Sequence, residues 1–243
     1  MDANQLMGKA LLDYYSGHYT TDMEFASNIS EKDIYPLPYF FRDYKQMPPI
    51  EQTALARCNG SVLDIGAGSG NHSLYLQDIG VDVTALDNSK DALEVCRLRG
   101  IKKTELSSIL AYNKTTFDTL LLLMNGIGIA QTLADLPAFL SHLKSLLKPG
   151  GQILVDSSDL QYMYERAPNG AILVPAKMTY YGQLDCELFY KNQKSEPFNW
   201  LYVDPVNFKE ACTSVGLDFK ILIKGDNYDY LAQLTALDKT PFL

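Results

Sequence analysis

The sequence predicts an α/β fold built on a doubly wound sheet of seven strands, mostly parallel with an antiparallel last strand. Strand-like and helix-like segments alternate between residues 61 and 156, an order typical of parallel sheets. A glycine-rich turn at residues 66–70 joins the first of these strands to a helix. The run Leu120–Met124 is apolar throughout, as expected of a strand that is buried on both faces.

The elements of this sheet follow from apolar runs and their boundary residues. Asn88 and Ser89 precede one helix as N-cap candidates, because their side chains accept hydrogen bonds from first-turn N–H groups. The Lys-Pro-Gly-Gly stretch at 148–151 ends another helix, since proline and glycine interrupt helices. The predicted strands are Ser61–Ile65, Val81–Asp87, Thr104–Ser108, Phe117–Met124, Gly151–Ser157, Asp218–Lys224 and Tyr228–Ala236. The predicted helices are Asn71–Ile79, Lys90–Arg99, Leu133–Leu147 and Val206–Val215.

Two further segments flank the central part of this sheet. Residues 1–57 begin with apolar residues at rough helical spacing, continue in a tyrosine-rich piece, and lead into the first strand through a predicted helix at 50–58. The aromatic residues either pack over the sheet edge or belong to a helical lid over the ligand, and we predict the lid. Residues 158–205 predict a β-hairpin insertion that covers the substrate. Its strand-like stretches are Lys177–Tyr181, Gln183–Tyr190 and Asn199–Val203. Within one domain, the chain therefore divides into a lid (1–57), a ligand-binding core (58–157), the insertion (158–205) and a C-terminal helix with a strand pair (206–243).

Composition and charge restrict the function. The 243 residues carry a formal net charge of −8, which disfavours a nucleic-acid partner because phosphate backbones bind clustered Lys and Arg. The four cysteines lie far apart without metal-ligand spacing, so no metal site is expected. The N-terminus lacks a signal-peptide core, and no apolar run approaches the ~20 residues of a membrane helix. We expect a cytoplasmic protein without a membrane partner. The aromatic-rich insertion also offers a face for a homodimer.

The turn at Gly66–Gly70 and the acidic residues near it predict a nucleotide-like ligand. Glycines let the backbone turn sharply and let a ligand lie against it. The helix that follows favours a carboxylate or phosphate at its start. The spacing is G-x-G-x-G, and Asn71 stands where a dinucleotide-binding pattern has its third glycine. Asp64 precedes the turn, and Asp87 ends the next strand, where a carboxylate can bind both hydroxyls of a ribose.

The stretch D-I-G-A-G-S-G at residues 64–70, followed by L-D-N-S at 86–89, resembles the class I S-adenosylmethionine (SAM)-dependent methyltransferases. The resemblance extends from about Cys58 to Ser157 and implies a Rossmann-like fold with SAM as the cofactor. It also implies that residues of the lid, the turn and the strand ends bind SAM: Tyr19, Asp64, Gly66, Ala67, Gly68, Gly70, Asp87, Asn88, Ser108, Ile109 and Asn125. Family members often carry Asp where Ser108 stands, so this position departs from the family pattern.

The resemblance further implies direct nucleophilic attack on the methyl carbon of SAM, in which the protein mainly aligns the reactants. A general base is needed only if the acceptor must lose a proton, and His18 and Tyr181 are the candidates. Residues 125–128, Asn-Gly-Ile-Gly, lack the two prolines and the aromatic residue of members that methylate exocyclic amines of bases or glutamine. We therefore expect a small-molecule methyl acceptor.

Other functions stay open on the sequence alone. A SAM-binding regulator or partner subunit without catalysis would keep the same motif, and a methyltransferase with a protein acceptor would also keep it. An NAD-linked oxidoreductase is disfavoured by Asn71 and by the lack of an evident hydride-relay residue. Aminopropyl transfer is disfavoured because Met124–Ala130 contains no acidic residue to hold a polyamine.

Overall fold

The computed structural model describes residues 1–237 and contains two β-sheets. The larger one, the core sheet, has the strand order β11-β12-β7-β6-β3-β4-β5. Only β12 runs against its neighbours β11 and β7, and the other pairs are parallel. The predicted doubly wound, Rossmann-like sheet is therefore confirmed. Its strands are β3 (Ser61–Ile65), β4 (Asp82–Asp87), β5 (Thr104–Leu106), β6 (Phe117–Leu122), β7 (Leu147–Ser158), β11 (Leu217–Lys224) and β12 (Asp229–Ala236).

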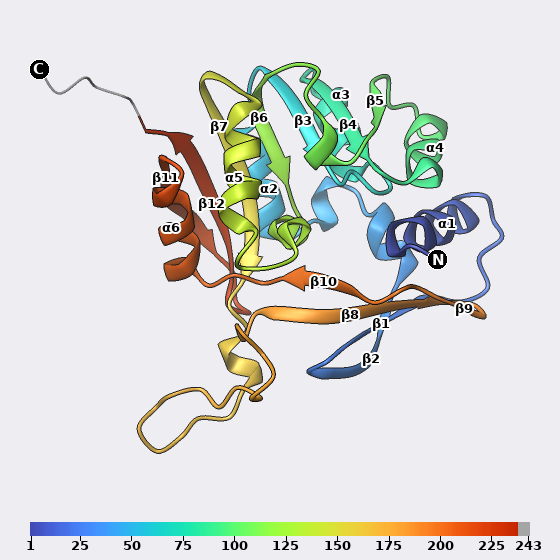
Figure 1. Ribbon diagram of the computed structural model, residues 1–243. Helices are drawn as coiled ribbons and strands as arrows, with labels where there is room; N and C mark the ends of the chain where they lie inside the picture. Colours follow the sequence, from blue (N-terminus) through green and yellow to red (C-terminus); the bar gives the residue numbers. More distant parts are fainter. Residues whose placement is uncertain (238–243) are drawn as a thin grey trace, which may run out of the picture.

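Helices cover both faces of the core sheet (Figure 1). Helices α5 and α6 share one hydrophobic core with Leu120 and Leu122 of β6. Helices α2 and α3 share another with Leu121. Successive side chains of a strand point to opposite faces, which explains why all four leucines of the run, 120–123, are buried. The helices are α1 (Ala3–Tyr15), α2 (Pro49–Arg57), α3 (Asn71–Asp78), α4 (Lys90–Leu98), α5 (Leu136–Ser145) and α6 (Pro205–Ser214).

The second sheet brings together segments that are far apart in the sequence. Its order is β10-β8-β1-β2, and the short β9 pairs with β8. Strand β1 pairs with β2 in a hairpin and with β8 on its other side. The N-terminal segment, predicted as a helical lid, therefore also supplies two strands, which the prediction lacked. The strands are β1 (Met23–Ser27), β2 (Ser30–Tyr35), β8 (Gln183–Tyr190), β9 (Gln193–Lys194) and β10 (Phe198–Leu201).

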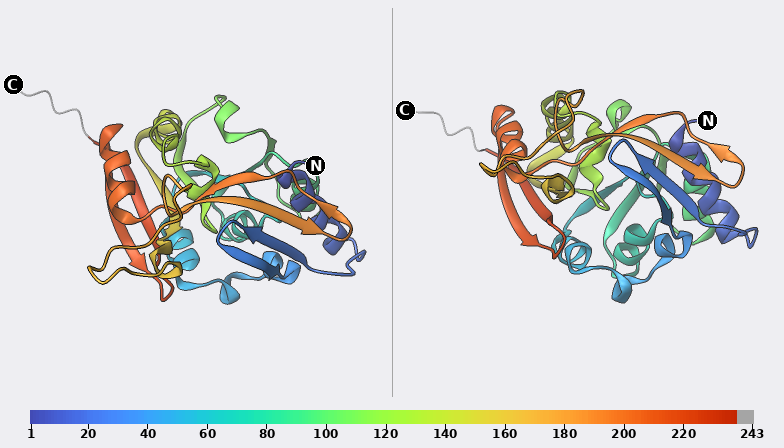
Figure 2. Two further views of the ribbon diagram at one scale, coloured as in Figure 1. Left: turned by 60° about the horizontal axis from the view of Figure 1, so that its bottom comes forward. Right: turned by 90° about the horizontal axis from the view of Figure 1, so that it is seen from below.

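The second sheet lies beyond the carboxyl ends of the core strands (Figure 1), and the view from below shows it extending across that edge (Figure 2). Two contacts fix this arrangement. The Asn125 Nδ2 group, just after β6, donates to the carbonyl of Leu201 at 3.0 Å. The backbone N–H of Val203 donates to Ser157 Oγ of β7 at 2.9 Å. Ligands of doubly wound sheets bind at this edge, so the second sheet borders the expected site.

Several element boundaries differ from the prediction. The stretch Lys177–Tyr181, predicted as a strand, forms turns and bends. Its hydroxyl-bearing side chains bond to acidic groups instead: Tyr180 to Asp204 at 2.6 Å and Tyr181 to Asp159 at 2.8 Å. Strand β7 begins at Leu147, before the Pro-Gly-Gly turn, because Phe117 pairs with Leu147 ahead of a register shift. Within residues 1–237, no helix combines the length and apolar character needed to cross a membrane.

Candidate functional site

The glycine turn follows β3 and is held against β4 by backbone hydrogen bonds. The N–H groups of Gly66 and Ala67 donate to the Leu86 carbonyl at 2.9 and 3.1 Å. Gly68 has a φ of +55°, which favours glycine, and a Cβ there would meet no atom closer than 3.9 Å. Gly70 has a φ of +83° and directly precedes α3. The turn thus leaves open space over Gly68, where a ligand can lie against the backbone.

Asp64 and Asp87 lie at neighbouring strand ends on either side of this turn. Asp64 is 2% exposed and accepts a hydrogen bond from Ser73 Oγ at 2.7 Å. Asp87 accepts from the N–H groups of Gly68 at 2.9 Å and Ser89 at 2.8 Å. Burial raises the pKa of both carboxyl groups, although these hydrogen bonds oppose the shift. A ligand that brings a cation or hydroxyl donors would therefore be favoured beside them.

Three further residues of the predicted SAM site lie farther along the same edge. Asn88 follows β4 and is exposed, and it lines an open surface cavity of about 400 Å³ between the start of α4 and α1. The N–H of Ser107 donates to the Asp87 carbonyl at 3.1 Å, which places the end of β5 beside the end of β4. Ser108 is exposed there, whereas Ile109 is 4% exposed and belongs to the core. Together with the glycine turn, these positions form one continuous stretch along the carboxyl edge of the core sheet.

Asn125 stands three residues after the end of β6, in a strained stretch of backbone. Met124 and Asn125 both have left-handed φ values, +64° and +58°, and such residues cost about 1–3 kcal/mol each where they persist. The Asn125 Nδ2 group is bonded to Leu201, but its Oδ1 atom is buried without a hydrogen-bond partner among the described residues. Strain and an unpaired acceptor at one strand end are both features of functional sites.

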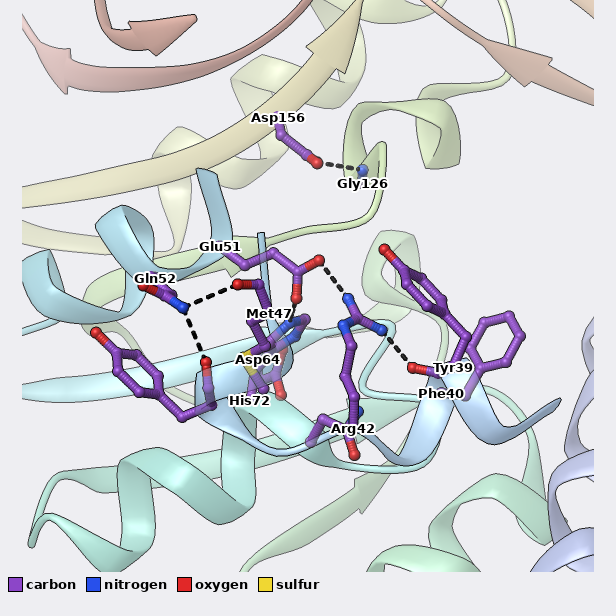
Figure 3. Close-up of polar contacts among 12 residues, drawn as sticks. Tyr39, Phe40, Arg42, Met47, Glu51, Gln52, Asp64, His72, Gly126 and Asp156 are labelled. Atoms are coloured by element: carbon purple, nitrogen blue, oxygen red, sulfur yellow. Dashed lines mark hydrogen bonds and ion pairs between the residues drawn. The ribbon is translucent and has the colours of Figure 1, made fainter. Parts of the chain in front are cut away.

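A buried ionic cluster, which the sequence analysis did not assign, lies beside the turn (Figure 3). Glu51 of α2 forms an ion pair with Arg42, and its other oxygen lies 2.7 Å from His72 Nε2 of α3. Burial opposes charge on Glu51, yet its two partners outweigh this and lower its pKa. Burial likewise opposes protonation of His72, but Glu51 and Asp64 raise its pKa. The cluster ties the segment before α2 to the helix that starts at the turn.

The sequence does contain a signal for this cluster. Glu51 lies within α2 three and four residues before Ala54 and Leu55, on the helix face that carries the buried residues. A carboxylate on the apolar face of a helix needs a partner. Sequence spacing alone does not identify the partners, because Arg42 and His72 come from other elements.

Asp156, on β7, is a second acidic residue that the sequence analysis missed. Its Oδ1 atom accepts from the N–H of Gly126 at 3.0 Å. It is partly exposed, and burial among protein groups raises its pKa to about 6. It lies beside Asn125, since β6 and β7 are adjacent parallel strands.

Three of the predicted site residues do not lie at the ends of the core strands. Tyr19 is in the loop after α1, where its hydroxyl donates to Asp22 at 2.9 Å. His18 is exposed, and its backbone carbonyl accepts from Lys191 at 3.3 Å. Tyr181 is bonded to Asp159, and burial together with this hydrogen bond raises its pKa well above the usual range. A tyrosine that stays protonated is a poor general base. The roles of all three stay predictions.

Comparison with known proteins now assigns the family. Residues 62–151 match a family model described as a methyltransferase domain. The chain is 38% identical to a SAM-dependent methyltransferase from Bacteroides fragilis whose crystal structure contains S-adenosyl-L-homocysteine (SAH). That structure superposes with a TM-score of 0.89 and covers 97% of this chain and 96% of the other. The chain therefore belongs to the class I SAM-dependent methyltransferases, and its cofactor is SAM.

More distant relatives match less than half of the chain. The cypemycin N-terminal methyltransferase of a Streptomyces species is 34% identical over 103 residues, which are 41% of this chain and 42% of that protein. A ubiquinone biosynthesis O-methyltransferase from Xanthomonas euvesicatoria is 26% identical over 113 residues, 43% of this chain and 46% of the relative. These matches cover less than half of either relative, so they do not identify the methyl acceptor of this chain.

Proposed function

We propose that this protein transfers the methyl group of SAM to a small-molecule acceptor. One observation carries the proposal: the carboxyl edge of the core sheet combines the glycine turn, two buried carboxyl groups and the strained end of β6. The open backbone of Gly68 and the carboxyl of Asp87, bonded to its N–H at 2.9 Å, suit the cofactor. Asn125, which is bonded to the second sheet, and Asp156 of β7 lie on the other side of β3 along the same edge.

Each cofactor residue has a proposed task. Asp64 faces the methionine ammonium, Gly66, Ala67 and Gly68 lie along the methionine and the ribose, and Asp87 accepts hydrogen bonds from the ribose hydroxyls. Gly70 permits the turn into α3. The remaining positions are proposed to contact the adenine, the methyl region or the lid side: Asn88, Ser108, Ile109, Asn125 and Tyr19. When bound, SAM supplies an activated methyl group on a sulfonium; the protein binds, orients and excludes water.

The acceptor is proposed to be small because the second sheet covers part of this edge (Figure 2). The names of two relatives refer to O-methylation and to methylation of an N-terminus, so both oxygen and nitrogen nucleophiles occur among similar proteins. A protein acceptor and SAM binding without catalysis are the alternatives. A homodimer and a cytoplasmic location stay predictions from the sequence.

Isothermal titration with SAM and SAH tests the proposal. We expect both ligands to bind the wild type and Asp87→Ala to weaken both affinities. Each hydrogen bond lost to a charged group accounts for about tenfold to a hundredfold. Asp82→Ala is the matched control, because Asp82 is exposed at the opposite end of β4. Asp87→Asn keeps the side-chain shape and one acceptor oxygen, so it should lose less affinity than Asp87→Ala.

The titration also separates the alternatives. If neither ligand binds the folded wild-type protein, the proposed function is wrong. If both bind but no acceptor class yields SAH from SAM, the non-catalytic SAM-binding protein is favoured. Thermal unfolding of each variant shows whether a loss of binding is merely a loss of the fold.

A further inference from the structure

Asp156 lies where the acceptor of the proposed methyl transfer is expected. The strand order places β7 next to β6 and β6 next to β3, and the connections reverse direction between β3 and β6. Ligands of doubly wound sheets lie at such a switch point. The carboxyl of Asp156 accepts a hydrogen bond from the N–H group of Gly126 at 3.0 Å. It is therefore fixed beside the strained end of β6, toward the part of the edge that the cofactor turn leaves free.

Among the residues that the structure describes, this carboxyl group has no counter-ion. Within residues 1–237, no lysine, arginine or histidine forms an ion pair with Asp156, although it is partly exposed. By contrast, the nearby Glu51 is neutralised by Arg42 and His72. An acidic group held near the reacting centre without a cation favours a ligand that supplies one.

Aromatic side chains face the same region. Figure 3 shows the hydroxyl end of Tyr39 directed toward the turn where Asp156 meets Gly126. Tyr39 is 46% exposed. Burial raises the pKa of its hydroxyl, Arg42 opposes the rise, and the charges of Glu51 and Asp156 add to it. Tyr202, after β10, is also influenced by the charge of Asp156. The phenolic oxygen of Tyr39 is a hydrogen-bond acceptor for an ammonium group.

The protonation of Asp156 reflects all of these neighbours. Burial raises its pKa to about 6, the N–H groups of Asn125 and Gly126 oppose the rise, Glu51 of α2 adds to it and His72 of α3 reduces it. At neutral pH the group is therefore an anion that can bind an ammonium. It is also a stronger proton acceptor than an ordinary aspartate.

We propose that the acceptor is an amine, and that Asp156 binds its ammonium group and removes the proton that it must lose. This inference rests on the proposed function. An ammonium has no lone pair for attack, so one N–H bond breaks and the proton passes to an oxygen of Asp156. The freed nitrogen lone pair then forms a bond to the methyl carbon while the carbon–sulfur bond breaks toward sulfur. The products are the methylated ammonium and SAH, and Asp156 returns its proton to solvent.

Sinefungin, a SAM analogue in which an amine-bearing carbon replaces the methylated sulfur, is the probe. Its ammonium occupies the region between methyl donor and acceptor. We expect sinefungin to bind the wild type more tightly than SAH does by about tenfold to a hundredfold, the range for a hydrogen bond between charged groups. Asp156→Asn should remove this preference while SAH still binds. Asp185→Asn, which removes the same charge from an exposed position on β8, should keep it.

The outcomes separate this inference from the proposed function. If SAH does not bind the wild type, the proposed function itself fails. If SAH binds and the preference for sinefungin is equal in the wild type and Asp156→Asn, an amine acceptor held by Asp156 is excluded. If Asp156→Asn does not fold, the pH dependence of sinefungin binding to the wild type tests the inference instead. Its preference for sinefungin should fall as the pH is lowered through about 6, and an unchanged preference overturns the inference.

Discussion

Glu51 is 3% exposed and shares its carboxylate between two cations. Placing such charges in the interior is costly, and the attraction offsets the cost only when the geometry is good and the remaining hydrogen bonds are made. Here Arg42 also donates to the Tyr39 carbonyl and stacks on the Tyr39 ring, 3.8 Å from its centroid. The cluster therefore orients the segment before α2 as well as balancing charge.

The pKa shifts of the Glu51–His72 pair predict a pH window for its contribution to stability. The pKa of His72 is raised above 6.5, so its contribution is present below that pH and lost as the pH rises through the raised value. The pKa of Glu51 is lowered below 4.5, so its contribution is lost only as the pH falls through the lowered value. Between the lowered pKa of Glu51 and the raised pKa of His72, we expect His72→Gln to have its largest effect and to reduce the unfolding free energy by about 1.5–3 kcal/mol.

Urea denaturation across the pH range measures this difference between wild type and variant. The control is the same substitution in a Glu51→Gln background, where the difference should follow pH less strongly, because only Asp64 then raises the pKa of His72. A difference that is constant from acid to alkaline pH would contradict the ion pair. A residual, pH-independent difference is expected, because His72 is buried and also fills space.

At this scale, the sequence predicted residues within one local pattern and missed those that meet through the fold. Asp64 and Asp87 were predicted because Asp64 precedes the glycine turn and Asp87 ends the next strand. Asp156 was missed because its significance depends on the pairing of β6 with β7, thirty residues apart in the sequence. The pairing partners of a buried charge are a tertiary property, which a single sequence does not show.

At the scale of the element, the start and end of α3 allow a matched test of the glycine turn. Gly70, before the helix, and Gly80, after it, both have φ values above +80°. An added Cβ at Gly80 meets no atom within 4 Å, whereas at Gly70 it would lie 2.3 Å from Ile101 Cδ1 and 2.9 Å from Cys96 Sγ. We expect Gly80→Ala to lose about 1–2 kcal/mol of unfolding free energy for the left-handed backbone alone.

Gly70→Ala should lose that amount and a further ~1–3 kcal/mol for overpacking. Urea denaturation measures both losses, and SAH titration shows whether the turn has moved. We expect affinity to fall for Gly70→Ala and to be retained for Gly80→Ala. Equal losses of stability would show that the side chains of Ile101 and Cys96 can move aside for the added Cβ without loss of unfolding free energy.

The same scale shows which elements a sequence can predict. The strands β3, β4, β6 and β12 and the helices α3 and α4 agree with the prediction within two residues, because apolar runs and clear caps mark them. The hairpin β1–β2 was missed. Strand β2 reads Ser-Glu-Lys-Asp-Ile-Tyr and is mostly exposed, so no alternation of apolar residues reveals it. Its strand conformation comes from pairing with β1, which in turn pairs with β8.

At the scale of the whole molecule, the two sheets share contacts that should make them unfold together. Trp200 of β10 packs in a cluster with Leu184 and Cys186 of β8. A Cβ on Gly128, just after β6, would lie 2.2 Å from the Trp200 ring. Tyr181 contacts this cluster and also the main core of the core sheet. The hydrophobic interior therefore continues from one sheet into the other.

Trp200 is the single tryptophan of the chain and lies at the junction of the two sheets, so its fluorescence reports their docking. Far-UV circular dichroism reports the helices, which cover the core sheet. If the shared contacts couple the sheets, both signals should change at the same urea midpoint, as two-state unfolding requires. SAH should raise both midpoints together, because a ligand that binds only the native state stabilises the whole cooperative unit. A fluorescence midpoint at lower urea would mean that the second sheet separates first. The acceptor side of the site would then open without unfolding the cofactor turn.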